Sequence, residues 1–323
     1  MILLCGIPSE TPLRLVQQRL DDANASYVMF NQRNFESCEI AFEVSHGCIS
    51  GRLRLGPESY RLEDFTAVYT RLMDDRCLPE LADQPEGSPL RVYCRGFHDA
   101  LTRWMELAPA LVVNRAIPMG SNGSKPYQSQ LIRAEGFLVP ETLVTSNPDA
   151  VREFREKHGR VIYKSASAVR SIVQTLEDAD LDRLSHIRWC PTQFQAFVEG
   201  TNVRVHVVGE RVYPTAVSTG ATDYRYAYRQ LGEAAELREV KLSDELAGRC
   251  VSLARRLGLT FAGVDLKVTP DDQVYCFEVN PSPAFSYYEA NTGQCISEGL
   301  AQALMEAGAA RGAAPATLTA VCG

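Results

Sequence analysis

Two strand-like runs near the carboxyl end of the sequence, 261–268 and 274–280, constrain the fold of this chain more than any other feature. They are joined by a turn that reads Thr-Pro-Asp-Asp-Gln, which favours a β-hairpin. If the two aspartates of the turn form a two-residue loop, Pro270 pairs with Gln273. Counting outward along both strands then brings acidic residues from distant positions opposite one another.

The predicted register places three polar side chains on one face of the hairpin. Asp265 lies opposite Glu278, and opposite residues have Cβ atoms about 4.5–5.5 Å apart on the same face. Asn280 follows Glu278 by two positions, so the strand period of two puts its amide there as well. Opposed like charges destabilise a sheet, so we expect a cation between them. All-oxygen ligation suits Mg²⁺ or Mn²⁺ far better than Zn²⁺. The alternative is a pair of solvated carboxylates on an ordinary hairpin.

The apolar residues that alternate with this polar set predict a buried opposite face. They are Val264, Leu266, Phe277 and Val279. Side chains of a strand alternate between its two faces, so a polar face and an apolar face are expected on the same hairpin.

Composition and charge exclude several classes of protein. The 323 residues are 45% hydrophobic and 23% charged, which is typical of a soluble chain with two or three subdomains. A net charge of −7 and no dominant basic cluster argue against a nucleic-acid partner. The ten cysteines include no Cys-x-x-Cys, which argues against zinc and a disulfide framework and favours a reduced cytoplasmic setting. The first residues lack a basic n-region and a long apolar run, so neither a signal peptide nor a membrane span is expected.

The first third of the chain alternates strand-like and helix-like segments, which predicts an α/β unit. The turn after the first strand has no Gly-x-Gly-x-x-Gly, so a dinucleotide fingerprint is absent. An alternating, glycine-split region predicts an inserted β-hairpin or meander at 38–61. The expected elements are strands at 2–7, 26–30, 65–69 and 111–114 and helices at 11–20 and 91–107.

The following segments predict further strands and helices around a polar loop at 119–124. Asn147, Pro148 and Gly159 are start and stop signals of a helix between them. The remaining expected elements are helices at 126–135 and 243–257 and strands at 141–145, 160–164, 192–198, 202–208 and 212–217.

Two lysines stand where a nucleotide's phosphates could be held. Lys125 begins a helix after a Gly/Ser loop, and Lys164 ends a strand before a polar segment. Lysines of this kind supply point charges to phosphate groups, although each lysine taken alone is an ordinary surface charge. Their order along the chain, before Asp265 and Glu278, supports a phosphate-binding role for both lysines.

This order resembles the ATP-grasp superfamily of carboxylate–amine ligases over about residues 114–307. Within it the sequence is most similar to the graspetide, or microviridin-type, ligases that cross-link ribosomal peptides, and next to RimK-like glutamate ligases. The pieces that carry the resemblance are Ser124-Lys-Pro-Tyr-Gln128, Ile162-Tyr-Lys-Ser165, Val169-Arg-Ser171, Asp223-Tyr-Arg225, Glu278-Val-Asn-Pro-Ser-Pro283, Tyr288-Glu289 and Thr292-Gly293. Ahead of this region, Ala67-Val-Tyr-Thr-Arg71 resembles the strand end of the peptide ligases' N-terminal domain.

The resemblance implies an α/β (α+β) ATP-grasp fold preceded by a pre-ATP-grasp α/β domain. The implied boundaries are 1–113 for the N-terminal domain, with a role in peptide or leader recognition, 114–192 for the central ATP-grasp subdomain, 193–311 for the C-terminal subdomain with the metal site, and 312–323 for a disordered tail.

The resemblance also implies roles for individual residues. Catalytic contacts to the γ-phosphate and the substrate carboxylate fall to Arg204 and Arg225. Each arginine also has a structural interpretation instead of a catalytic one. Arg204 could be the cross-strand partner of a nearby acid, and Arg225 could be an ordinary loop residue. Nucleotide-binding positions are Lys125, Lys164, Ser165, Arg170, Ser171, Gln195, Ala196, Phe197, Val198, Glu199 and Asn202, and metal-ligand positions are Asp265, Glu278 and Asn280.

The implied activity is ATP-dependent ligation through an acyl phosphate, giving an amide or an ester. ATP and Mg²⁺ are the implied cofactors, with two ions expected and Mn²⁺ as a substitute, and the substrate is a peptide or amino acid. Graspetide-type ligases are commonly dimers, so the resemblance also implies a homodimer, which the residues themselves do not demonstrate.

Two other functions stay open at this point. The first is a RimK-like or dipeptide-type ligase that acts on a free amino acid, a small molecule or a protein. The second is a non-catalytic nucleotide-binding module, because the loop after Lys164 has no glycine. The sequence also departs from the family pattern at the adenine and ribose contacts, where Ala196 replaces a common Glu and Asn202 a common Asp.

Overall fold

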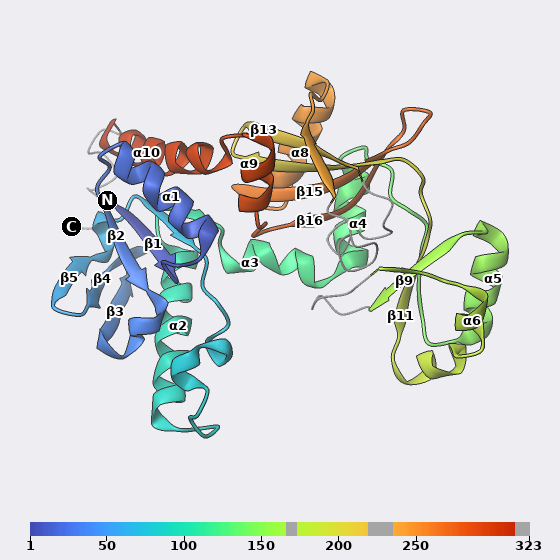
Figure 1. Ribbon diagram of the computed structural model, residues 1–323. Helices are drawn as coiled ribbons and strands as arrows, with labels where there is room; N and C mark the ends of the chain where they lie inside the picture. The colour runs from blue at the N-terminus through green and yellow to red at the C-terminus, as the bar shows by residue number, and fades with distance from the viewer. Residues whose placement is uncertain (166–172, 219–234, 314–323) are drawn as a thin grey trace.

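The computed structural model describes residues 1–165, 173–218 and 235–313. In Figure 1 the N-terminal residues, coloured blue and cyan, form a unit at one end of the molecule. Residues from about 140 to 196, in green and yellow, form a second unit at the other end, and a sheet of later residues lies between the two. This is the mixed α/β architecture expected from the sequence.

A parallel sheet in the order β2-β1-β6-β7 forms the centre of the N-terminal unit. Its strands are β1 (Ile2–Gly6), β2 (Tyr27–Asn31), β6 (Ala67–Thr70) and β7 (Leu111–Val113). Alternate residues of β1 pack against α1 (Thr11–Asp22) on one face and α2 (Pro89–Leu107) on the other. The whole of β1 is therefore buried, which explains its unbroken apolar run.

A three-stranded antiparallel sheet occupies the inserted region that the sequence predicted as a hairpin or meander. Its strands are β3 (Cys38–Ser45), β4 (Cys48–Leu55) and β5 (Glu58–Arg61). Cys38 and Leu53 point into the core beside α2, whereas the tip of the hairpin is exposed.

The last two helices, α9 (Ser286–Thr292) and α10 (Ile296–Ala313), return to the N-terminal unit. Figure 1 shows α10, in red, lying beside α1, in blue. Three leucine or isoleucine residues of α10 share one core with α1: Ile296, Leu300 and Leu304 pack with Leu13, Val16 and Leu20. The core of the N-terminal unit is thus completed by the other end of the chain.

Helix α10 reaches Ala313 and so extends two residues into the segment 312–323 that was expected to be a tail. The rest of that segment lies outside the described residues.

The second unit is a four-stranded sheet in the order β10-β9-β11-β8 covered by short helices. Asn147 caps α5 by accepting a hydrogen bond of 2.9 Å from Asp149 N, and Gly159 ends it with a φ of +69°. The helix signals read from the sequence are therefore correct. The bounds are β8 (Thr142–Thr145), α5 (Pro148–His158), β9 (Val161–Ser165), β10 (Gln174–Thr175), α6 (Asp178–Leu181) and β11 (Thr192–Ala196).

The third unit is an antiparallel sheet in the order β14-β13-β12-β15-β16. Helices α4 and α8 cover one face, where Ile132 and Leu253 pack against Val205 and Val264. The bounds are α3 (Ala116–Met119), α4 (Lys125–Ala134), β12 (Thr201–Val208), β13 (Arg211–Ser218), β14 (Glu236–Glu239), α8 (Asp244–Arg256), β15 (Phe261–Val268) and β16 (Val274–Asn280).

The β15–β16 hairpin differs from the predicted one in its turn. Val268 pairs with Val274, so the loop has five residues, and Thr269 N donates to Gln273 O over 3.0 Å. The predicted pairing of Pro270 with Gln273 is wrong, because Gln273 bonds to Thr269 instead, through its carbonyl oxygen and its N–H. The register then shifts by one at a bulge, where Phe277 has no direct partner, and Asp265 pairs with Glu278 as predicted.

Among the described residues, no helix combines the length and the apolar character needed to cross a membrane.

Candidate active site

The two carboxylates of the β15–β16 hairpin meet as the sequence predicted, with the amide of Asn280 between them. Asn280 Nδ2 donates to Asp265 Oδ2 over 3.0 Å and to Glu278 Oε1 over 3.3 Å. The pairing also shows Gly263 opposite Asn280. Three oxygen- or nitrogen-bearing side chains therefore converge on one spot at the end of the hairpin.

Lys125, the first residue of α4, supplies a cation to this spot. Its Nζ lies 2.8 Å from Glu278 Oε2, and it also donates to Asn122 Oδ1 over 2.7 Å. Both charged side chains are mostly shielded, with exposed fractions of 19% for Lys125 and 14% for Glu278. An ion pair at this depth is screened less by solvent than a surface pair.

A buried glutamine one turn along α4 fixes the position of Lys125. Gln128 Nε2 donates to the Val279 carbonyl oxygen and Gln128 Oε1 accepts from Val279 N, both over 2.9 Å. The side chain is 1% exposed and pairs with β16 as a neighbouring strand would. The amino end of α4 is therefore attached to the strand that carries Glu278 and Asn280.

Arg204 supplies the second cation from the neighbouring strand. The register of β12 and β15 places Arg204 directly opposite Asp265, and the distance from Arg204 Nε to Asp265 Oδ1 is 2.9 Å. The arginine side chain is 8% exposed. The cross-strand alternative is therefore what the structure shows, and the acid partner belongs to the candidate metal site. The catalytic role of Arg204 stays a prediction.

Gly263 makes room for the Arg204 guanidinium. A Cβ at this position would lie 2.4 Å from Arg204 Nη1 and 2.8 Å from Pro283 Cβ. Gly263 lies two residues before Asp265 and so shares its face of β15. Any side chain here would displace the arginine or the loop that follows β16.

A pocket of about 780 Å³, partly open to solvent, lies over these groups between the second and third units. Its polar end is formed by Lys164, Arg204, Asp265 and Glu278. Three of these residues come from the third unit, whereas Lys164 comes from β9 of the second. One concave site therefore collects cations and carboxylates from both units.

The other end of the pocket is less polar and lies along the segment that joins the two units. Four predicted nucleotide-binding residues line it: Gln195, Phe197, Val198 and Asn202. Apolar walls are added by Ile162 of β9 and Leu266 of β15. An apolar slot with a cationic, carboxylate-bearing end suits a planar base attached to a polyphosphate.

The donor set of the hairpin fits Mg²⁺. Two carboxylates and an amide are hard oxygen donors, and Mg²⁺ is usually held by one or two carboxylates together with phosphates and water. In the structure the amide nitrogen of Asn280 faces both acids. To bind a metal, the amide must turn so that its oxygen faces the two acids. This turn exchanges the amide oxygen and nitrogen, whose positions are assigned only from their hydrogen-bond partners. Among the described residues, no cluster of three or more His, Cys, Asp or Glu side chains competes as a metal centre.

Residues 128–304, more than half of the chain, match the family model of the RimK-like ATP-grasp domain. The chain belongs to the RimK-like ATP-grasp family. The resemblance inferred from the sequence is thus confirmed for the family. Lys125 lies just before the matched residues.

Curated relatives of this RimK-like chain carry the name probable alpha-L-glutamate ligase. The protein from Parasynechococcus marenigrum is 26% identical over 61% of the chain, and the match spans only 44% of that relative's length. The protein from Histophilus somni is 24% identical over 91% of the chain and 94% of its own length.

Solved structures share the fold over nearly the whole chain. The ATP-grasp ligase PsnB, complexed with a minimal precursor, is 26% identical with a TM-score of 0.76, and the match covers 95% of this chain and 98% of PsnB. A RiPP-associated ATP-grasp ligase from Chryseobacterium gregarium, in complex with ADP and a leader and core peptide, is 20% identical. Its TM-score is 0.81, with 94% of this chain and 96% of that one covered. The predicted ATP-grasp fold is therefore confirmed.

Several predicted site residues lie elsewhere than in the pocket. Ala196 ends β11 and Glu199 is exposed in the joining segment. The backbone of Ser165 pairs with Thr192. Arg170, Ser171 and Arg225 fall outside the described residues, so their roles stay predictions.

Two pocket residues were missed or misplaced by reasoning from the sequence. Phe277 was expected on the buried face, but the bulge turns it toward the pocket, which it lines together with Glu278. Lys267 also lines the pocket, and its position two residues after Asp265 was a signal that could have found it. Burial, with a smaller effect of Arg160, lowers the pKa of Lys267.

Proposed function

We propose that this chain is an ATP-dependent ligase that joins a carboxylate of a precursor peptide to an amine or hydroxyl of the same peptide. The observation that carries the proposal is the paired arrangement Lys125–Glu278 and Arg204–Asp265 around Asn280 at the polar end of the pocket. The likeness to PsnB and to the Chryseobacterium gregarium ligase, both solved with peptide substrates, supports the peptide as substrate.

ATP would lie along the pocket with its base in the apolar slot. Ile162 and Leu266 would contact the faces of the adenine, and the backbone of 195–198 would hydrogen-bond its edge. Asn202, which lines the pocket, would hold the ribose. Lys125 and Lys164 would approach the phosphates as point charges, which is the usual role of lysine in such sites.

Asp265, Glu278 and Asn280 would hold Mg²⁺, with two ions expected and Mn²⁺ as a substitute. When bound, the metal neutralises phosphate charge while the γ-phosphoryl group moves to a carboxylate. Without the metal, the two acids do not repel one another strongly, because Lys125 and Arg204 each neutralise one of them. When nucleotide arrives, both cations can turn from the acids to the phosphates.

Arg204, assisted by Arg225, would hold the substrate carboxylate against the triphosphate. The approach brings two anions together, and guanidinium contacts offset the repulsion while fixing the direction of attack. The carboxylate oxygen attacks the γ-phosphorus and releases ADP, giving an acyl phosphate. An amine or hydroxyl then attacks the acyl carbon, loses its proton and expels inorganic phosphate, leaving an amide or ester.

The decisive experiment combines the purified chain with ATP, Mg²⁺ and peptides encoded beside its gene that contain Asp or Glu together with Lys, Ser or Thr. Mass spectrometry should show the loss of one water for each bond formed, and ADP should appear in equal amount. A peptide that instead retains a phosphoryl group would point to a kinase, and tight ATP binding without turnover on any acceptor would point to a non-catalytic module.

Variants of the hairpin test the metal assignment. Glu278→Gln and Asp265→Asn should abolish ADP formation while the fold survives, since each removes one charge from the oxygen set. Asp272→Asn is the matched control: it lies in the turn of the same hairpin, is exposed and has a φ of +59°, a conformation that asparagine adopts readily. Normal turnover in both Glu278→Gln and Asp265→Asn would refute the metal assignment.

A second candidate acts on free amino acids and is favoured by the curated relatives named alpha-L-glutamate ligases. It predicts ADP release with free glutamate and a small or protein acceptor, at rates that exceed those with peptides.

Homodimer formation and a cytoplasmic location also stay proposals, and the former is checked by light scattering.

A further inference from the structure

The carboxyl ends of β1 and β6 form a crevice at the point where the strand order of the parallel sheet reverses. After β1 the chain adds β2 on one side, and the next strand of this sheet, β6, lies on the other side of β1. In open α/β sheets, ligands bind in the crevice outside the carboxyl ends of the two strands at such a switch point. The catalytic pocket described above lies in the other units and leaves this crevice without a function.

A pocket with about 840 Å³ of empty space, part of it open to solvent, occupies this crevice. One wall is the segment after β1, with Ile7, Ser9 and Glu10. The opposite wall is the segment after β6, with Leu72 and Met73 beside the arginine that ends the strand. Ser282, which follows β16, closes the third side. Three segments far apart in the sequence therefore build one site.

Arg71 crosses the floor of the crevice and connects these segments. Its Nε donates to Glu10 Oε1 over 2.7 Å, its Nη2 lies 2.6 Å from the same oxygen, and its Nη1 donates to Ser282 Oγ over 3.2 Å. The side chain is 11% exposed. Both nitrogens that reach Glu10 use a single carboxylate oxygen.

The other oxygen of Glu10 is an acceptor in need of a donor. Within the part of the chain that the structure describes, Glu10 Oε2 is shielded from solvent and has no hydrogen-bond partner. A buried acceptor without a donor costs free energy, typically about 1–3 kcal/mol. The Glu10 side chain as a whole is 34% exposed, so a rotation of its carboxylate would bring this oxygen to the crevice, where a ligand N–H or O–H would satisfy it.

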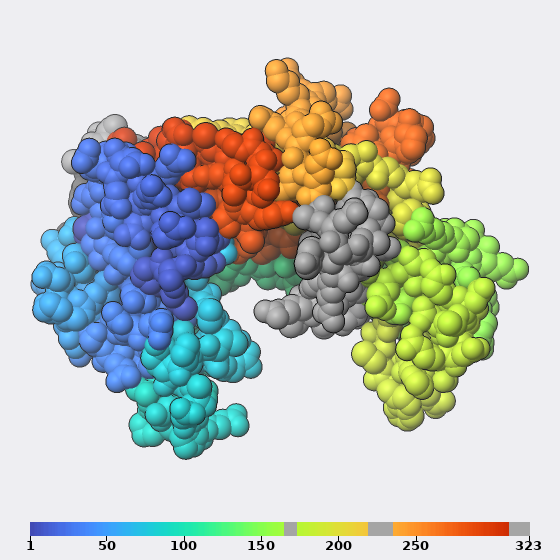
Figure 2. Space-filling model, in the orientation of Figure 1, coloured from blue at the N-terminus to red at the C-terminus, as the bar shows by residue number. Residues whose placement is uncertain are grey.

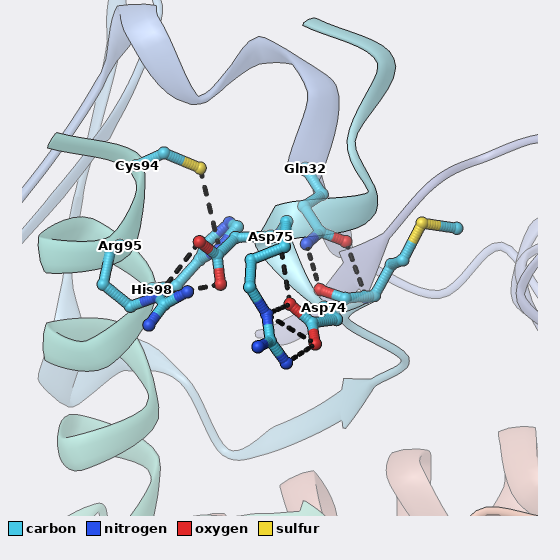
Figure 3. A network of polar contacts seen from close by, with 8 residues as sticks. Gln32, Asp74, Asp75, Cys94, Arg95 and His98 are labelled. Carbon is cyan, nitrogen blue, oxygen red and sulfur yellow. Dashed lines mark hydrogen bonds and ion pairs between the residues drawn. The ribbon is translucent and has the colours of Figure 1, made fainter. Parts of the chain in front are cut away.

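The walls of the crevice are fixed before any ligand binds. Gln32, fully buried, donates to the Met73 carbonyl oxygen over 2.6 Å and accepts from Met73 N over 2.8 Å. Figure 3 shows Gln32 near the ion pair of Asp75 with Arg95 of α2, which anchors the residues that follow Met73. At Gly6 a Cβ would lie 3.0 Å from the Arg71 carbonyl oxygen, so only glycine allows the two strand ends to approach this closely.

The crevice adjoins the site of the reaction. Ser282 follows Asn280 by two residues, so their Cα atoms are separated by at most about 7 Å. A group bound against Glu10 and Ser282 thus lies on the N-terminal side of the candidate metal site. Figure 2 shows the molecule hollowed between the N-terminal unit and the second unit, which leaves a route for a chain-like substrate.

We propose that this crevice is the acceptor subsite, which binds the substrate side chain whose amine or hydroxyl attacks the activated carboxylate. The inference rests on the ligase function proposed above and names where the nucleophile is held. Ile7, Leu72 and Met73 contact an aliphatic stem, as in a lysine side chain, while Glu10 Oε2 accepts from the amine or hydroxyl at its tip. Arg71 holds the Glu10 carboxylate in position through its Nε and Nη2.

A binding experiment tests the subsite without requiring turnover. The probe is Nα-acetyl-lysine N-methylamide, titrated into the full chain and followed by saturation-transfer NMR, with the norleucine analogue as the ammonium-free comparison. The lysine probe should bind more tightly than the norleucine analogue, and Glu10→Gln should weaken it about tenfold. Equal binding of the lysine probe to wild type and Glu10→Gln, or equal binding of both probes, would overturn the proposal.

The chain offers a matched control and a second variant. Glu80 is also paired with an arginine, Arg33 at 2.5 Å, and also keeps one shielded oxygen without a partner, but it lies outside the crevice. Glu80→Gln should leave probe binding unchanged. Should Glu10→Gln lose its fold in circular dichroism, Met73→Trp fills the crevice from an exposed position and should block the probe.

An activity experiment separates failure of the subsite from failure of the ligase function. With a peptide that wild type cross-links, Glu10→Gln should still form hydroxamate from ATP, peptide and hydroxylamine, because this small nucleophile bypasses the crevice. The same variant should lose most of the native cross-link. Loss of both products to the same extent contradicts the subsite, whereas hydroxamate absent from wild type contradicts the ligase function instead.

Discussion

Lys267 Nζ donates a hydrogen bond of 3.0 Å to the carbonyl oxygen of Val198, and this bond connects the third unit to the segment that leads out of the second. The preceding residue is Phe197, whose ring centroid is 5.1 Å from Lys267 Nζ and 3.6 Å from the Arg160 guanidinium carbon. Two cations, one from each unit, thus contact the same aromatic ring. The arrangement fixes the joining segment against which the base of a nucleotide would lie.

Replacing Lys267 with methionine should weaken ATP binding. The Val198 carbonyl loses its donor and the joining segment loses a cation–π contact, so we expect the Kd for ATP to rise about tenfold. Calorimetric titration measures this change. Lys241→Met removes an exposed lysine and serves as the control. Wild-type affinity in Lys267→Met would show that the bond does not position the nucleotide site.

Gly263→Ala should impair the reaction far more than the fold. The added Cβ meets the Arg204 guanidinium at 2.4 Å, so the arginine must leave Asp265. We expect ADP formation to fall at least tenfold, as for the loss of a single electrostatic contact in other enzymes. Gly248→Ala is the control, since nothing lies within 4 Å of a Cβ there and α8 should gain about 0.5–1 kcal/mol. Unchanged turnover in Gly263→Ala would contradict the role given to Arg204.

Gln128→Leu should destabilise the protein and displace Lys125. The substitution leaves the N–H and C=O of Val279 buried without partners, at a cost of about 2–4 kcal/mol in the free energy of unfolding. Denaturant unfolding measures this cost. Gln130→Leu changes an exposed residue of the same helix and should have little effect. Equal stabilities of the two variants would mean that α4 is held to β16 by other contacts.

His206 should make the protein sensitive to mild acid. Burial, with a smaller contribution from Arg204, lowers the pKa of His206 well below its usual range, and both ring nitrogens lack partners among the described residues. The unfolded chain therefore binds a proton near pH 6.5 that the folded chain does not bind. Stability is complete above that pH and falls below it by up to about 1.4 kcal/mol per pH unit.

The comparison of thermal unfolding at pH 7.5 and pH 5.5 tests this dependence. His206→Phe fits among Phe261 and Tyr288 and should lose less stability between the two pH values than wild type. His186→Asn, at an exposed position, should keep the wild-type dependence. An identical loss in wild type and His206→Phe would assign the acid sensitivity to other groups.

The pairing of Asp265 with Glu278 was predicted correctly, although the turn from which it was counted was predicted wrongly. The real loop is longer by three residues, and the bulge at Phe277 restores the register that a two-residue loop would have given. A bulge has no reliable signal in a single sequence, because it depends on how the strand bends over its neighbours. The same bulge explains why Phe277 lies in the pocket rather than in the core.

The sequence by itself determined the family, the α/β fold and the residue types of the candidate site, because strand period, helix signals and the order of charged residues are local or sequential properties. Only the tertiary structure decided which groups meet. Gln128 against β16, Arg204 in the space left by Gly263, and Arg71 between Glu10 and Ser282 are contacts between distant segments. Their partners are selected by close packing around buried polar groups, which no local pattern encodes.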